Sequence, residues 1–143
     1  MPGREREALM GRLDGRVAVI TGAGQGVGRG VARRYAREGA RIVVAEMNAE
    51  TGPRTVAEVR ELGGEAEFVP TDVGIEEQAR GCVAAAIDRW GRIDVLVNNA
   101  WGGGSHKRFE WKTDRDMQHG WRVGTMSAFW TMPFLLRRKY MTH

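Results

Sequence analysis

The chain has 143 residues, of which 42% are hydrophobic, as is typical of one globular domain with its own core. Its formal net charge of +4 comes from scattered arginines, without the interleaved aromatic residues of a nucleic-acid-binding stripe, so we expect no nucleic-acid partner. No apolar run approaches the roughly 18 residues of a membrane span, and the first residues lack the apolar stretch of a signal peptide. A soluble, cytoplasmic protein is therefore expected.

Strand and helix patterns alternate along the chain. Short, unbroken β-branched runs predict four strands buried on both faces. These strands cover residues 16–21, 41–46, 65–70 and 92–98. Apolar residues at helical spacing predict helices over residues 25–38, 49–62, 75–90 and 117–138. Pro133 would kink the last of these helices.

This alternation predicts an α/β fold. We expect a partial Rossmann-like, doubly wound parallel sheet of about four strands in the spatial order 3-2-1-4, with helices on both faces. Residues 1–143 would form a single domain, in which the charged residues 1–14 would be flexible. In such sheets a ligand binds at the carboxyl ends of the strands, at the switch point between strands 1 and 4.

A glycine-rich turn follows the first predicted strand at that switch point. Gly22, Gly26 and Gly28 would leave backbone N–H groups accessible to a phosphate, and the next helix would direct the positive end of its dipole at the anion. Glu46 closes the second strand 18 residues after Gly28. A carboxylate that binds the ribose of a dinucleotide is expected about 20 residues after the turn. The alternatives are a plain strand-to-helix turn and a solvated strand-end carboxylate.

Three motifs follow one another after the predicted strands. They are Thr21-Gly22-x-x-x-Gly26-x-Gly28, Asp72-Val73 and Asn98-Asn99-Ala100. Together they resemble the short-chain dehydrogenase/reductase family over residues 12–100, and more weakly to about residue 136. The resemblance implies an NAD-dependent oxidoreductase that transfers a hydride between the nicotinamide and a carbon bearing a hydroxyl or carbonyl group. This chain would be its cofactor-binding half, and the small-molecule substrate stays unidentified.

The resemblance also implies roles for the turn and the second strand. Thr21 would fix the turn through its hydroxyl. Glu46 would accept hydrogen bonds from the adenosine ribose and repel a 2′-phosphate, and Gln25 brings no positive charge, so NAD is expected rather than NADP. If that interpretation is wrong, Arg29 and Arg41 are the candidate phosphate partners.

The motifs after the third and fourth strands would complete the site. Asp72 resembles the family residue that hydrogen-bonds the adenine amino group; a helix cap is an alternative role compatible with the first. Asn98 resembles the residue that ties neighbouring strands, and the backbone of Asn99 and Ala100 would contact the cofactor. The expected cofactor-binding residues are therefore Thr21, Gly22, Gln25, Gly26, Val27, Gly28, Glu46, Asp72, Val73, Asn98, Asn99 and Ala100.

The sequence departs from the family in several places. The family catalyses its reaction with Tyr-x-x-x-Lys, but Tyr35 lies in the first helix and no lysine follows Tyr140, so no catalytic residue is assigned and the chain looks truncated. The alternative function is a non-catalytic dinucleotide-binding or interaction module. Trp101 stands where the family usually has glycine. Thr125 aligns with an assisting asparagine, with an ordinary helix threonine as the alternative.

Three further expectations concern the rest of the chain. Cys82, the only cysteine, reads as a small core residue. The three histidines are far apart in the sequence, so no metal site is expected. The fourth strand would be an edge, and the last helix carries more apolar side chains than one face can bury, so self-association is expected. These side chains are Trp121, Phe129, Trp130, Phe134 and Leu135.

Overall fold

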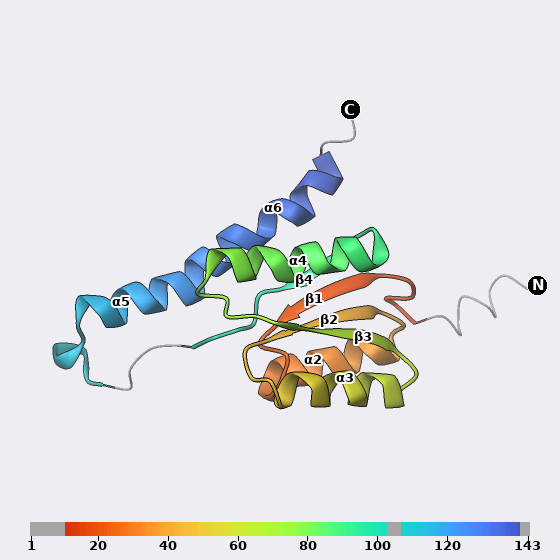
Figure 1. The fold of residues 1–143 in the computed structure, drawn as a ribbon, viewed down its shortest axis with the longest axis horizontal. Helices are drawn as coiled ribbons and strands as arrows, with labels where there is room; N and C mark the ends of the chain where they lie inside the picture. Colours follow the sequence, from red (N-terminus) through yellow and green to blue (C-terminus); the bar gives the residue numbers. More distant parts are fainter. Residues whose placement is uncertain (1–10, 103–106, 141–143) are drawn as a thin grey trace, which may run out of the picture.

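The structure is a computed structural model that describes residues 11–102 and 107–140, with the backbone alone at 137–140 (Figure 1). Of the predicted flexible start, 1–14, only residues 11–14 are described. They form a turn, in which the Leu13 N–H donates to the Glu38 carbonyl at 2.9 Å and the Leu13 side chain packs against the core.

Four parallel strands form one sheet in the order β3-β2-β1-β4, which confirms the predicted topology. They are β1 (Val17–Thr21), β2 (Arg41–Glu46), β3 (Glu65–Pro70) and β4 (Val95–Val97). β4 lies at the edge of this four-stranded sheet and is shorter than the predicted strand 92–98.

Hydrogen bonds anchor β4 at both of its ends. On its N-terminal side, the Asp94 carboxylate accepts the Val17 N–H at 2.9 Å and binds the Arg92 guanidinium at 2.6 Å. On its C-terminal side, the Asn99 N–H donates to the Val97 carbonyl at 3.1 Å and to the Thr21 hydroxyl at 3.0 Å, so the chain turns after Val97. After Val97 these bonds take the place of ladder pairing, whereas before Val95 the Asp94 N–H still donates to the Val17 carbonyl at 2.8 Å.

Helices cover both faces of the sheet, as predicted (Figure 1). α2 and α3 lie on one face, and α4 and α6 on the other. The helices are α2 (Gly26–Arg37), α3 (Thr51–Glu61), α4 (Glu76–Trp90), α5 (Asp114–Trp121) and α6 (Ser127–Tyr140), with a short 3₁₀ turn at Phe109–Trp111.

Two cores follow from the alternation of side chains along the strands. Ile20 and Ile42 are fully buried against α2 and α3, whereas Val19 and Val43 are fully buried on the opposite face with α4. Cys82 belongs to the second core, which confirms its prediction as a core residue, and burial raises the pKa of its thiol to about 11.

The prediction of one continuous last helix over residues 117–138 was wrong, both in where the helix starts and in its continuity. α5 begins at Asp114 because Thr113 and Asp116 form a capping box, in which each side chain accepts the other residue's N–H. A π-helical segment, Arg122–Met126, separates α5 from α6, and Pro133 lies inside α6.

Packing corrects the expectation for the apolar face of that helix. Trp130 is buried, and Phe134 and Leu135 pack against the second core. Trp121 and Phe129 are each 60% exposed. Some of the apolar side chains that were expected to stay exposed on this helix are therefore covered by α4 and the sheet. No described helix combines the length and apolar composition needed to cross a bilayer.

Candidate functional site

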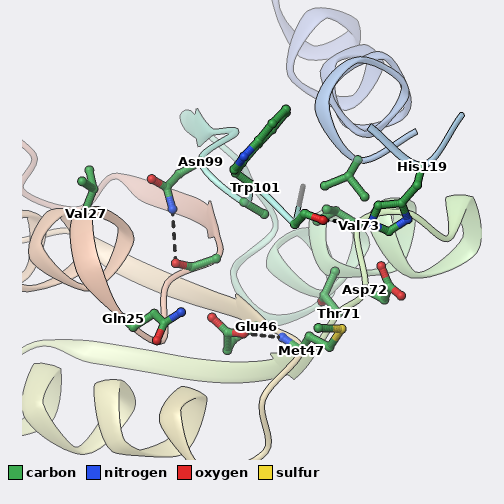
Figure 2. A pocket seen from close by; sticks show the side chains of 14 residues that line it. Gln25, Val27, Glu46, Met47, Thr71, Asp72, Val73, Asn99, Trp101 and His119 are labelled. Carbon is green, nitrogen blue, oxygen red and sulfur yellow. Dashed lines mark hydrogen bonds between the residues drawn. The ribbon is translucent and has the colours of Figure 1, made fainter. Parts of the chain in front are cut away.

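A cavity of about 400 Å³ lies at the carboxyl ends of the strands, where the sequence predicted a ligand (Figure 2). The segments after all four strands contribute to it, together with α5 and the π-helical segment. It is lined by Gly22, Gln25, Val27, Glu46, Met47, Thr71, Asp72, Val73, Asn99, Ala100, Trp101, Gly102, His119 and Val123. Eight of the twelve predicted residues line it, and Thr21, Gly26, Gly28 and Asn98 do not.

The turn after β1 requires glycine at three positions, and the structural reason differs from one position to the next. Gly22 has a φ of +65°, and a Cβ there would lie 2.8 Å from the Ala100 Cα. A Cβ on Gly28 would overlap the Gly22 carbonyl and lie 2.6 Å from the Asn99 Nδ2. Gly26 has a φ of +53°, and a Cβ there would meet no atom within 4 Å. Gly28 is therefore needed for helix packing, and Gly26 leaves open space at the N-terminus of α2.

That N-terminus keeps its backbone donors available. Gln25 is the N-cap residue of α2, and its side chain makes no capping hydrogen bond. The first N–H groups of a helix have no intrahelical acceptor, and the helix dipole favours an anion beside them. The turn and helix can therefore receive a phosphate group through backbone N–H groups alone.

Glu46 is held at the end of β2 by backbone N–H groups. Its Oε2 accepts the Gly24 N–H at 2.8 Å, and its Oε1 accepts the N–H groups of Met47 at 2.8 Å and Asn48 at 3.1 Å. A carboxylate has about four lone-pair sites. Three are used here, so Oε2 keeps one for a ligand that enters the cavity.

Gly24 is a site residue that the sequence analysis missed. A Cβ at this position would lie 2.7 Å from the Glu46 Oε2 and would also overlap the Thr51 hydroxyl. Only glycine therefore allows the Glu46 carboxylate to approach the turn. The signal was in the sequence, because Gly22, Gly24, Gly26 and Gly28 alternate without interruption.

Thr21 and Asn99 join the turn after β1 to the segment after β4. The Thr21 Oγ1 accepts the N–H groups of Asn99 and Ala100, both at 3.0 Å, and donates to the Val97 carbonyl at 3.3 Å. The Asn99 Nδ2 donates to the carbonyls of Thr21 at 3.0 Å and Gly22 at 3.2 Å. A dashed line from the Asn99 side-chain nitrogen marks such a hydrogen bond in Figure 2. The structural role predicted for the Thr21 hydroxyl agrees with these contacts.

The tie predicted for Asn98 was assigned to the wrong residue. Asn99 makes it, and the Asn98 Oδ1 instead accepts the hydroxyl of Thr131 at 3.0 Å. Thr131 is fully buried in α6. Consecutive side chains of an extended segment point in opposite directions, so only one of the two asparagines can reach β1.

Asp72 closes a turn before α4. Its Oδ1 accepts the Gly74 N–H at 2.8 Å, and its own N–H donates to the Gln78 Oε1 at 2.8 Å. The alternative of a helix cap was wrong, because the N-cap residue of α4 is Ile75 and the Asp72 carboxylate binds one residue earlier. Asp72 and the buried Val73 both line the cavity.

Comparison with known proteins identifies the family. The family model described as short chain dehydrogenase matches residues 16–141. The chain belongs to the short-chain dehydrogenase family. The resemblance seen in the sequence motifs is thereby confirmed.

Several relatives resemble this short-chain dehydrogenase chain over its length. It is 38% identical over 118 residues to the 7alpha-hydroxysteroid dehydrogenase of Escherichia coli K12, covering 82% of this chain and 46% of that protein. It is 47% identical over 89 residues to the sorbitol dehydrogenase of Cereibacter sphaeroides, covering 62% of this chain and 34% of that protein. The chain thus spans between a third and a half of the length of these relatives.

Solved structures of the family share this fold. The hydroxysteroid dehydrogenase from Escherichia coli matches with a TM-score of 0.81 and 36% identity, covering 87% of this chain and 52% of that one. A 7 alpha-hydroxysteroid dehydrogenase complexed with NADH and 7-oxo glycochenodeoxycholic acid matches with a TM-score of 0.81 and 36% identity, covering 87% and 48%.

Three further residues, Trp101, His119 and Thr125, concern the cavity or its surroundings in this short-chain dehydrogenase chain. Trp101 lines the cavity and is 73% exposed. His119 on α5 also lines it, and its Nε2 lies 2.8 Å from the Gly102 carbonyl oxygen. Thr125 is exposed in the π-helical segment and lines a second hollow of about 800 Å³ rather than the first cavity. Its predicted assisting role is untested.

The two alternative phosphate partners of this short-chain dehydrogenase chain are engaged elsewhere. Arg29 binds Glu58 at 2.7 Å, and this hydrogen bond lowers the pKa of the Glu58 carboxyl below its ordinary value. Arg41 begins β2, at the end remote from Glu46, and pairs with Glu65 at 3.3 Å. In the described part of the chain, no three His, Cys, Asp or Glu side chains lie close enough to hold a metal ion.

Proposed function

We propose that the cavity binds a nicotinamide adenine dinucleotide, and that it prefers NAD to NADP. The turn after β1 and the N-terminus of α2 would bind the pyrophosphate, and Asp72 and Val73 would bind the adenine. The observation that carries the proposal is the Glu46 carboxylate, which three backbone N–H groups hold beside the cavity with one lone-pair site free.

The preference follows from charge. One adenosine ribose hydroxyl could donate to the free site on the Glu46 Oε2. A 2′-phosphate would bring about two negative charges against this carboxylate at pH 7, and like charges at short range repel. Gln25 is uncharged, and Arg29 and Arg41 are bound to glutamates, so none of these residues offsets the repulsion.

We further propose that the cofactor serves an oxidoreductase acting on an alcohol or carbonyl carbon. The bound nicotinamide would accept or supply the hydride. The residues of this chain bind and orient: Thr21 and Asn99 lock the segment after β4 against the turn that receives the pyrophosphate. Family membership and the NADH complex of the 7 alpha-hydroxysteroid dehydrogenase support this proposal.

Calorimetric titration with NAD and NADP tests the proposed function. The wild-type chain should bind NAD more tightly, and Glu46→Ala should narrow the difference because the repulsion is lost. Glu46→Arg should reverse it. Glu61→Ala is the matched control, since it removes an equal charge at an exposed position outside the cavity. Equal or tighter binding of NADP by the wild type would refute the preference.

A further inference from the structure

Trp101 is an aromatic side chain placed at the border of two hollows. It lines the proposed dinucleotide cavity and also the second hollow of about 800 Å³ beside α5. It is 73% exposed, although apolar aromatic side chains are usually buried. An exposed indole that faces a cavity is available to a ligand.

The backbone on both sides of Trp101 is held by hydrogen bonds. The N–H of Ala100, immediately before it, donates to the Thr21 Oγ1 at 3.0 Å. The carbonyl of Gly102, immediately after it, lies 2.8 Å from the His119 Nε2. The indole is therefore carried by a fixed segment, in contrast to an aromatic side chain on a free loop.

The indole also rests on a position without a side chain. A Cβ on Gly124, in the π-helical segment, would lie 3.0 Å from the Cζ3 of Trp101, which is closer than ordinary van der Waals contact. Gly124 therefore provides the room that the ring occupies. Among the described residues, arginine guanidinium groups lie over the rings of Trp111 and Trp130, and none lies over the ring of Trp101.

The position of Trp101 indicates which part of the dinucleotide it meets. Glu46 and Met47 lie on one side of the cavity and Trp101 on the other (Figure 2). If Glu46 binds the adenosine ribose and the turn after β1 binds the pyrophosphate, the nicotinamide extends to the side opposite Glu46. The wall on that side is Trp101.

We propose that the indole face of Trp101 contacts the nicotinamide ring and makes the site favour the oxidised cofactor over the reduced one. This inference rests on the proposed function. The oxidised ring is a pyridinium cation, whereas the dihydronicotinamide of NADH is neutral. An indole face attracts a cation, more strongly than the faces of phenylalanine or tyrosine do. The contact thus discriminates between two ligands of nearly equal shape.

Calorimetric titration of wild type and variants with NAD, NADH and AMP tests this contact. Trp101→Leu should weaken NAD binding by about threefold to tenfold, the range that a partly desolvated cation–π contact supplies. The variant should weaken NADH binding much less and leave AMP binding unchanged, because AMP has no nicotinamide. Trp101→Phe, which keeps a weaker aromatic face, should give an intermediate NAD to NADH ratio. Trp121→Leu is the control, since Trp121 is 60% exposed and lines only the second hollow.

The three ligands separate the possible outcomes. A parallel loss of affinity for NAD, NADH and AMP in both Trp101 variants would show that Trp101 only supports the fold, and would overturn the inference. An unchanged NAD to NADH ratio would overturn it as well. If Trp101→Leu does not fold, the ratio measured with Trp101→Phe decides. A wild-type chain that binds none of the three ligands would refute the proposed function itself.

Discussion

Two alanine substitutions in the same turn should have opposite consequences. Gly28→Ala should damage folding, because its Cβ would overlap the Gly22 carbonyl and lie 2.6 Å from the Asn99 Nδ2. Gly26→Ala should damage nucleotide binding instead, because its Cβ would enter open space against which the proposed site places the pyrophosphate. Gly30→Ala in α2 is the matched control, since its Cβ would also meet nothing within 4 Å.

The structure sets the expected magnitudes. The Gly28 clash involves backbone atoms that cannot rotate away, so the free energy of unfolding should fall by about 3 kcal/mol, at the upper end of ordinary overpacking costs. At Gly26 the φ of +53° costs an alanine about 1 kcal/mol. The loss of NAD affinity there should reach about tenfold, or about 1.4 kcal/mol. Gly30→Ala should raise the free energy of unfolding by about 0.5 to 1 kcal/mol, because alanine favours a helix interior.

Urea unfolding and calorimetric titration of NAD measure the two effects on the same samples. A Gly28→Ala variant as stable as the wild type, or a Gly26→Ala variant less stable than Gly28→Ala, would contradict the different steric surroundings assigned to the two glycines. A stable Gly26→Ala variant that binds NAD as tightly as the wild type would show that the pyrophosphate does not lie against this turn.

Three further outcomes are expected. Thr21→Val should lower the free energy of unfolding by about 1 to 3 kcal/mol in urea titrations, because it removes the hydroxyl that accepts the part-buried N–H groups of Asn99 and Ala100, whereas Thr21→Ser should retain most of that free energy. The bond from Arg29 lowers the folded-state pKa of Glu58, so its stabilisation is present above the ordinary carboxyl pKa and is lost as pH falls through the lowered one. Wild type should therefore lose more stability than Glu58→Gln between about pH 6 and about pH 3, and equal losses would exclude this contribution. We also predict that the chain self-associates through the apolar side chains that are exposed on α5 and α6. Sedimentation that shows a monomer at micromolar concentration would contradict this prediction.

Local sequence patterns determined the fold class and the strand order. β-Branched runs between helical repeats predicted parallel strands joined by right-handed crossovers, and the doubly wound, Rossmann-like arrangement then predicted the order β3-β2-β1-β4 that the structure has. Gly22, Glu46 and Asp72 could be located at the cavity for the same reason. Each lies at or just after the carboxyl end of a strand, and the carboxyl ends of parallel strands meet at one edge of a sheet.

Only the tertiary structure decided which side chain meets which partner. Asn98 and Asn99 are adjacent identical residues, and no local pattern distinguishes the one that reaches Thr21 from the one that reaches Thr131. The need for Gly24 arises from the Glu46 carboxylate, 22 residues away. The Asp94 carboxylate, just before β4, binds the Val17 N–H of β1, 77 residues away in the chain.

The end of the chain shows the same division. The apolar repeat after residue 117 predicted a helix. The capping box before this helix, the π-helical segment within it and the burial of Trp130 depend on how α5 and α6 pack on the rest of the molecule. Secondary structure and the edge of the sheet where a ligand binds follow from periodicity, which is local. Hydrogen-bond partners, close backbone approaches and the placement of Trp101 over Gly124 follow from contacts between residues distant in the chain, which periodicity does not encode.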